Sequence, residues 1–274
     1  MKKITCRLCS HYCQLKEGQA GICGVNSNED GILTCKVYGY PTALHVDPIE
    51  KKPLYHFLPH TQTLSLGTVG CNFKCPFCQN WQLSQAKEFD TTNYISPTKI
   101  VDLALHHKCE SISYTYNEPT IFFPYAKDIA IEAKKVGLKN IMVSNGFMTQ
   151  ELCEEIPHFI DAINIDIKSF DENYYKKTLK GSLHVVLQNA KTLKQKGVHV
   201  EITTLYIPSL DEEQIESIAS FIADELGVDT PWHISAYHPD YKMTETKRTP
   251  IESLKKAYSI AKEHKIQNVY LGNI

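Results

Sequence analysis

Residues 63–81 read TLSLGTVGCNFKCPFCQNW, an apolar run followed at once by three cysteines. The run Thr63–Val69 has the composition of a buried strand. Cys71, Cys75 and Cys78 come next, separated by three and then two residues. This spacing can wrap three thiolates around one corner of a cubane cluster of four irons, which normally takes four thiolates. Because no fourth cysteine follows at short range, one iron would keep an open position.

An iron with an open position indicates a reactive centre rather than a plain electron store. The alternative for these three cysteines is a structural zinc site. Such sites usually have four protein ligands, often arranged as paired Cys-x2-Cys knuckles. The loop has neither feature, so we expect it to hold an iron–sulfur cluster.

The composition of the chain excludes several classes of protein. It has 274 residues and a formal net charge of −2, and its only arginines are Arg7 and Arg248, so we expect no nucleic-acid partner. No apolar run approaches the roughly 18 residues that span a bilayer, and the N-terminus lacks the apolar core of a signal peptide. Ten cysteines then predict metal binding or burial rather than disulfides. We expect a cytoplasmic protein with no membrane partner.

The chain divides into residues 1–60, a small Cys-rich extension, and residues 61–274, where apolar strands alternate with amphipathic helices. The expected strands are 63–69, 111–116, 140–144, 162–167, 198–207, 232–236 and a short 268–271. Helices are expected near 97–107, 120–136, 149–156, 184–196, 211–226 and 250–264. This alternation predicts a parallel sheet with right-handed crossovers. Since a full barrel needs eight units, the sequence predicts an α/β fold, a partial (β/α)6 barrel of parallel strands with a metal-binding N-terminal extension.

Polar clusters follow the expected strands one after another, where a barrel-type enzyme carries its active site. After the cysteine loop come residues 114–119 (YTYNEP), 144–146 (SNG), 166–168 (DIK), 204–207 (TLYI), and His233 with Ser235. Polar residues placed at random would not gather at one end of every strand. The sequence therefore predicts one composite site at the carboxyl edge of the sheet.

The cysteine spacing, with the aromatic Phe77 before the last cysteine, resembles the motif of the radical S-adenosylmethionine (SAM) superfamily. The resemblance implies a [4Fe–4S] cluster on Cys71, Cys75 and Cys78, with SAM chelating the open iron. An electron from the cluster would split SAM to a 5′-deoxyadenosyl radical that abstracts hydrogen from a substrate. The resemblance also implies a flavodoxin or ferredoxin as the reductant.

The resemblance assigns SAM contacts to several of the strand-end residues. Residues 116–119 (YNEP) stand where the family commonly has Gly-Gly-Glu-Pro, so Glu118 would accept hydrogen bonds from the SAM ammonium and Asn117 would lie beside it. The alternative is a surface glutamate at a helix start, next to Pro119. Ser144 and Asn145 would meet the ribose or the carboxylate of SAM; an ordinary strand-to-helix turn is the alternative.

Asp166 and Lys168 share one face of a strand. They resemble the Asp-Leu-Lys element of glycyl-radical-enzyme activases, which lies beside the methionyl group of SAM; a structural ion pair is the alternative. His233 resembles a histidine at the end of the sixth strand that reaches the ribose, although a lone histidine is more often a core residue. Phe77 and Trp81 would cover the adenine or pack in the core.

The N-terminal cysteines form a second candidate metal site. Four of them, Cys6, Cys9, Cys13 and Cys23, lie in a short glycine-rich segment that could hardly fold alone. Four thiolates could close a tetrahedral zinc site, whose binding energy would replace a missing core, or hold a second [4Fe–4S] cluster that relays electrons. We slightly favour zinc.

The linker 47–57 (DPIEKKPLYHF), together with residues 70–73 and 78–81, closely resembles the radical SAM proteins of the AmmeMemoRadiSam system, relatives of pyruvate formate-lyase activating enzyme. Within it, Lys51, Lys52 and His56 could line the mouth of a substrate site, although solvated charge is the favoured interpretation. Members of that family continue into a tail with another cysteine pair. The end at Ile274 therefore implies a truncated tail or a shorter subtype.

Two substrate classes stay open. The radical could act on a partner protein, as it does in glycyl-radical activases, or on a small metabolite. A third hypothesis of another class is a non-enzymatic iron–sulfur electron-transfer protein. Four positions argue against that hypothesis, because an electron carrier needs no SAM cradle: Glu118, Asp166, Lys168 and His233. We therefore predict a radical SAM oxidoreductase of unknown substrate.

Overall fold

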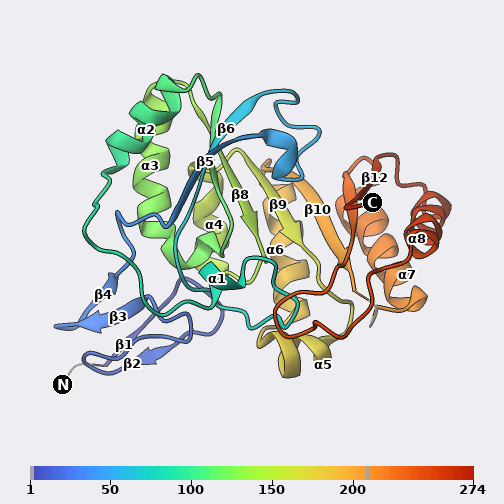
Figure 1. Cartoon of the computed structure of the whole chain (residues 1–274), viewed down its shortest axis with the longest axis horizontal. Helices are drawn as coiled ribbons and strands as arrows, with labels where there is room; N and C mark the ends of the chain where they lie inside the picture. Colours follow the sequence, from blue (N-terminus) through green and yellow to red (C-terminus); the bar gives the residue numbers. More distant parts are fainter. Residues whose placement is uncertain (1–2, 208–209) are drawn as a thin grey trace.

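The computed structural model describes residues 3–207 and 210–274. Its centre is a sheet in the order β12-β11-β10-β9-β8-β7-β6-β5 (Figure 1). The strands are β5 (Ala43–Pro48), β6 (Gln62–Gly67), β7 (Ser111–Tyr114), β8 (Lys139–Ser144), β9 (Ala162–Asp166), β10 (His199–Tyr206), β11 (Trp232–Ala236) and β12 (Val269–Gly272). Strands β6 to β12 run parallel, which confirms the predicted α/β class of the partial barrel. Strand β5 adds an antiparallel edge next to β6.

The longer helices pack along the outer face of this sheet, whereas α1 lies in the cysteine loop and α5 lies below the carboxyl edge (Figure 1). The helices are α1 (Trp81–Ser84), α2 (Pro97–His106), α3 (Phe123–Lys135), α4 (Gln150–Glu155), α5 (Glu172–Tyr174), α6 (Leu183–Gln195), α7 (Glu212–Phe221) and α8 (Ile251–Glu263). Polar side chains cap several of their first turns, as N-caps should. Ser96 accepts from the Lys99 amide, Thr149 from the Leu152 amide and Asp211 from the Gln214 amide.

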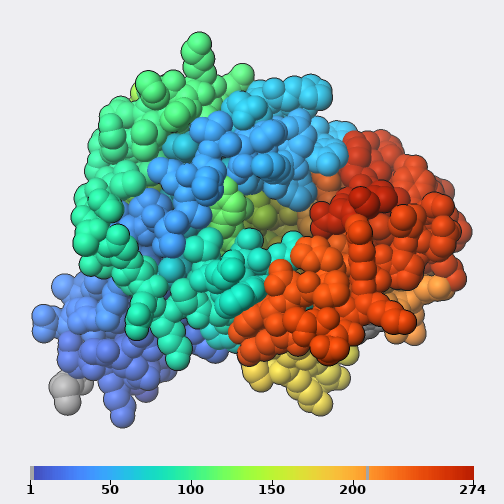
Figure 2. Space-filling model, viewed as in Figure 1, coloured from blue at the N-terminus to red at the C-terminus, as the bar shows by residue number. Residues whose placement is uncertain are grey.

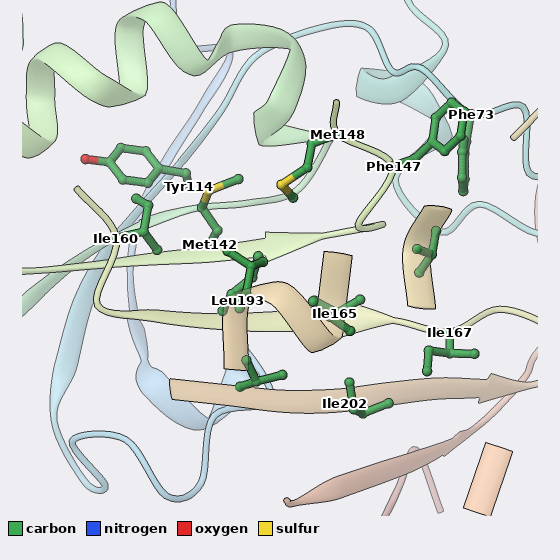
Figure 3. Packing of buried hydrophobic residues seen from close by; sticks show 14 of the residues in the cluster. Phe73, Tyr114, Met142, Phe147, Met148, Ile160, Ile165, Ile167, Leu193 and Ile202 are labelled. Carbon is green, nitrogen blue, oxygen red and sulfur yellow. The ribbon is translucent and has the colours of Figure 1, made fainter. Parts of the chain in front are cut away.

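The hydrophobic core lies between the sheet and the helices, while the inner face of the sheet is polar. Strand β9 shows this alternation: Ile163 and Ile165 are fully buried in the core cluster, and Asn164 between them points to the opposite face. Figure 3 shows Ile165 and Ile167 in this core, with Phe73 of the cysteine loop beside Phe147. A polar inner face leaves room for a polar site inside the partial barrel.

The N-terminal part consists of two short ribbons, β1 (Ile4–Thr5) with β2 (Gln14–Leu15) and β3 (Asn26–Glu29) with β4 (Ile32–Cys35). It docks on the loop after β8. The Thr149 amide donates to Leu8 O at 3.2 Å, and Cys9 bridges to Met148. The division at residue 60 stays a prediction, and β5 before that residue already belongs to the main sheet.

The connection between β5 and β6 crosses the amino ends of the strands. We call residues 49–58 of it the plug segment. Ile49 and Leu54 pack on Ile141 and Ala162, at the starts of β8 and β9. The side-chain amide of Asn164 donates from Nδ2 to Pro53 O at 2.7 Å. The segment therefore closes the amino end of the partial barrel, opposite the cysteine loop.

Between the plug segment, coloured blue, and the cysteine loop, coloured teal, the surface is hollowed (Figure 2). The hollow faces the inner side of the sheet, whose carboxyl ends carry the predicted site residues. In the part of the chain that the structure describes, no helix is long and apolar enough to span a membrane.

Candidate active site

A pocket of about 350 Å³ lies at the carboxyl ends of the strands. The structure brings together here most of the residues that the sequence predicted for the site. Those that line the pocket are Cys71, Cys75, Phe77, Cys78, Asn117, Glu118, Asn145, Asp166 and Lys168. Ser144 supports the pocket from behind, and His233 is not in its lining.

The cysteine loop leaves β6 through two glycines that no other residue could replace without movement. A Cβ on Gly67 would lie 2.5 Å from Thr115 O, and a Cβ on Gly70 would lie 2.7 Å from Cys23 O, where φ is also +90°. The loop then turns so that all three thiols face the pocket. Burial raises the pKa of the Cys75 thiol to about 12, so metal binding must displace its proton.

Glu118 is buried at the wall of the pocket and is held by donors from two elements. Its Oε1 accepts from Ser144 Oγ at 2.7 Å and from Thr120 Oγ1 at 2.5 Å, and its Oε2 accepts from the Asn145 amide at 2.7 Å. Burial raises the pKa of Glu118, against the opposing effect of these hydrogen bonds. Among the described residues Glu118 forms no ion pair, so the carboxylate suits a positively charged ligand group.

Asn117 holds the backbone that leads into the cysteine loop. Its Oδ1 accepts from the Thr68 amide at 3.0 Å, and its Nδ2 donates to Gly70 O at 2.9 Å. Its neighbour Tyr116 takes φ +69°, a conformation that favours glycine. The Tyr116 hydroxyl donates to Asp47 Oδ2 at 2.7 Å, which helps to hold this strained residue where the family commonly has glycine.

Asn145 connects the loop after β8 to the cysteine loop. Its Nδ2 donates to Asn72 Oδ1 at 2.8 Å, and its Oδ1 accepts from the Phe147 amide at 3.0 Å. The predicted SAM contacts of Ser144 and Asn145 stay predictions. In this structure the two residues fix Glu118 and Asn72.

Asp166 and Lys168 extend from the end of β9 into the pocket, as their shared strand face predicted. Lys168 Nζ lies 3.1 Å from Asp166 Oδ2. Burial lowers the pKa of Lys168, but the Asp166 carboxylate and Cys75 raise it by more, so the ammonium stays charged. The pair therefore presents both a donor and an acceptor beside the cysteine loop.

The two aromatic residues proposed for the adenine differ in position. Phe77 is buried and lines the pocket. Trp81 is 37% exposed and stacks on Tyr241 at 5.3 Å between ring centroids, outside the pocket lining. Trp81 thus joins the cysteine loop to the segment that follows β11.

The predicted SAM contact of His233 stays a prediction. His233 is the second residue of β11, where its Nε2 hydrogen-bonds with Glu201 Oε2 at 2.6 Å and its ring packs on Tyr55. His238 lies just beyond the end of β11, and its Nε2 contacts Gln79 of the cysteine loop at 3.0 Å. His238 was not among the residues predicted for the site, although the stretch WHISAYH offers both histidines.

Around the N-terminal cysteines, the thiols lie near one another. Cys6, Cys13 and Cys23 all raise the pKa of Cys9 electrostatically, after the larger effect of burial. Among residues 3–207 and 210–274, no group of three or more His, Cys, Asp or Glu side chains is arranged to hold a metal ion. This finding covers Cys71, Cys75 and Cys78 as well as the N-terminal cysteines, so the ligand assignments of both metal sites stay predictions.

The side chains that line the pocket are of the types that bind an iron–sulfur cluster together with SAM. Three soft thiols share it with one buried carboxylate that has no cationic partner and with a Lys–Asp pair. Soft thiolates select iron–sulfur clusters, and carboxylates bind ammonium groups. The same wall could therefore hold the cluster and the amino-acid part of SAM.

Comparison with known families agrees with this donor set. The family model described as the radical SAM superfamily matches residues 65–222, more than half of the chain. The chain belongs to the radical SAM superfamily. This membership implies a [4Fe–4S] cluster and SAM, and it makes the protein an enzyme.

Similar proteins include one from Methanocaldococcus jannaschii, named as uncharacterized, which is 42% identical over 99% of this chain and 82% of its own length. A second protein of that organism, a putative glycyl-radical enzyme activating enzyme, is 30% identical over 75% of this chain and 86% of its own. A crystallised domain of the pyruvate formate-lyase-activating enzyme from Bacteroides vulgatus aligns with a TM-score of 0.53 at 16% identity. The match covers 60% of this chain and 99% of that one. That likeness concerns the fold alone.

Proposed function

We propose that this radical SAM enzyme cleaves SAM reductively and uses the 5′-deoxyadenosyl radical to abstract hydrogen from a substrate. The observation that carries the proposal is the pocket itself, in which Cys71, Cys75 and Cys78 face Glu118 and the Asp166 carboxylate. When bound, the cluster and SAM supply the radical chemistry, and the protein positions and shields the reactants.

The residues of the chain divide this work. Glu118 accepts hydrogen bonds from the SAM ammonium. Ser144 Oγ and the Asn145 backbone amide bind its two oxygens and so fix the orientation of the carboxylate. Cys71, Cys75 and Cys78 hold the cluster. Lys168 and Asp166 orient the methionyl end, and Phe77 covers the adenine. These roles follow the chemistry of each side chain and its place in the pocket lining.

Two classes of substrate remain. Relatives named as glycyl-radical activating enzymes support an activase-like reaction on a partner protein. The plug segment supports a small metabolite instead, because it closes the amino end of the partial barrel and its Lys51 and Pro53 line the pocket.

The proposed reductant is a flavodoxin or ferredoxin. For the N-terminal site we propose a metal on Cys6, Cys9, Cys13 and Cys23, either zinc or a second [4Fe–4S] cluster. Metal analysis of the purified protein, combined with Mössbauer spectra of an ⁵⁷Fe-labelled sample, distinguishes the two. Zinc without a second cluster supports the first, and eight irons support the second.

Anaerobic reconstitution followed by addition of SAM and dithionite tests the enzymatic proposal. We expect 5′-deoxyadenosine from the native protein and none above background from Cys75→Ala, because that variant lacks one cluster ligand. Cys109→Ala, at a buried cysteine outside the pocket lining, is the matched control and should keep the product. A reconstituted native protein that forms no 5′-deoxyadenosine would falsify the proposal.

A further inference from the structure

One wall of the pocket carries a positive charge that the proposed SAM contacts do not use. Among the described residues in the lining, the cations are Lys51 and Lys168. Lys168 already pairs with Asp166 at 3.1 Å. Lys51 comes from the plug segment, not from the cysteine loop, and its side chain is 67% exposed.

The carboxylate beside Lys51 is already neutralised by another cation. Asp47 Oδ2 accepts from Lys52 Nζ at 2.7 Å and from the Tyr116 hydroxyl at 2.7 Å, and the Lys52 side chain is only 4% exposed. Lys51 Nζ reaches the other oxygen of Asp47 at the longer distance of 3.3 Å. Two lysines therefore share one carboxylate, and the surplus positive charge lies on the exposed lysine at the pocket wall.

We propose that Lys51 binds an anionic group of the substrate, a carboxylate or a phosphate. The inference rests on the proposed function and extends it to the substrate class. Glu118 provides the negative partner for the SAM ammonium at one wall of the pocket, and Lys51 provides the positive partner for the substrate. The buried Asp47–Lys52 pair anchors Lys51 and leaves its charge uncompensated.

Inorganic phosphate and succinate serve as probes, with succinamide as the neutral analogue of succinate. Ligand-observed NMR measures their binding to the anaerobically reconstituted protein with SAM present. We expect Lys51→Met to weaken binding of at least one anion by about tenfold, as the loss of a charge-assisted contact would, and Lys51→Arg to keep most of it.

The matched control is Lys139→Met. Lys139 is 51% exposed and pairs with Asp161 at 3.2 Å, much as Lys51 pairs with Asp47, but it lies outside the pocket lining. Its anion affinity should equal that of the native protein. A preference for phosphate or for succinate in the native protein identifies the chemical source of the anion, and both outcomes support the proposal.

Three results overturn the inference: equal anion affinity in Lys51→Met and the native protein, binding of succinamide as tight as that of succinate, and a loss of SAM affinity in Lys51→Met at least as large as the loss of anion affinity. The last result would place Lys51 on the SAM carboxylate.

Formation of 5′-deoxyadenosine is measured separately in the same preparations. If the native protein makes this product and Lys51→Met binds both anions normally, the inference alone fails. If no product forms, the proposed function fails.

Discussion

The two ends of the partial barrel each bury a glutamate, and the two carboxylates have opposite surroundings. Glu118, at the carboxyl end, accepts from hydroxyls and a backbone amide, and burial raises its pKa. Glu201, at the amino end, accepts from His199, His233 and the amides of the plug segment. Burial alone would raise the pKa of Glu201, but these contacts lower it to about 2.

This contrast separates a binding carboxylate from a structural one. The partners of Glu201 include two histidines, and they join β10, β11 and the plug segment. Glu118 has fixed donors but no ion pair within residues 3–207 and 210–274, and it lines a pocket. A buried acid without a positive partner is a better candidate for a ligand contact than one that the fold already satisfies.

The largest expected effect on SAM binding comes from Glu118→Gln. This change keeps the shape of the side chain and removes the charge that the SAM ammonium needs. We expect the affinity for SAM to fall by roughly 10- to 100-fold, which corresponds to the loss of a charge-assisted hydrogen bond. Equilibrium binding of radiolabelled SAM to the reconstituted variant measures it. An unchanged affinity would remove Glu118 from the SAM site.

Glu201→Gln is the matched change at the other end and should act on stability. We expect it to lower the free energy of unfolding by about 1–3 kcal/mol, because two histidines lose a charged acceptor. The affinity of the reconstituted variant for SAM should stay native-like. Chemical denaturation gives the first quantity and the SAM-binding assay the second. A variant that is fully stable but binds SAM poorly would reverse the assignment.

The pH dependence of stability sharpens the same test. The pKa of Glu201 lies at about 2 in the folded protein, below its ordinary value of 4.5. The ionised carboxylate therefore stabilises the fold above that ordinary value, and the stabilisation is lost as the pH falls through about 2. Between about pH 5 and pH 2, the native protein should lose more stability than Glu201→Gln. Parallel denaturation curves over this range would contradict the assignment.

The smallest expected effect on stability and on SAM affinity is that of Trp81→Leu, because Trp81 lies at neither of the two glutamate sites. Trp81 stacks on Tyr241 and is partly exposed, so the change should cost at most about 1 kcal/mol of stability. Because Trp81 does not line the pocket, SAM affinity should change less than in Glu118→Gln. Thermal unfolding with and without SAM compares the two variants. A loss of SAM affinity as large as that of Glu118→Gln would place Trp81 in the site.

The strands and helices of the molecule were predicted well from the sequence, because the spacing of their apolar residues can be read directly from it. The strand from Trp232 to Ala236 was predicted with its observed ends. The stretch WHISAYH carries two histidines, and the sequence alone gives no sign of which one contacts the cysteine loop. His238 became visible only through its contact with Gln79.

The plug segment was harder to predict, because it has no periodicity and its contacts are all long-range. Lys52 was expected to be a solvated charge, yet it is buried beside Asp47. No local pattern indicates that β5 joins the main sheet or that Glu201 binds backbone amides of residues 55 and 56. Such features depend on how distant segments meet, and only the folded chain shows them.

Electron–nuclear double resonance on the reduced, reconstituted protein with isotope-labelled SAM tests the central claim most directly. The label is placed on the amino nitrogen and the carboxylate of the methionyl group. The account predicts hyperfine coupling of both labels to the cluster in the native protein, and its weakening in Glu118→Gln at subsaturating SAM. An intact cluster that shows no coupling to either label at saturating SAM would contradict it.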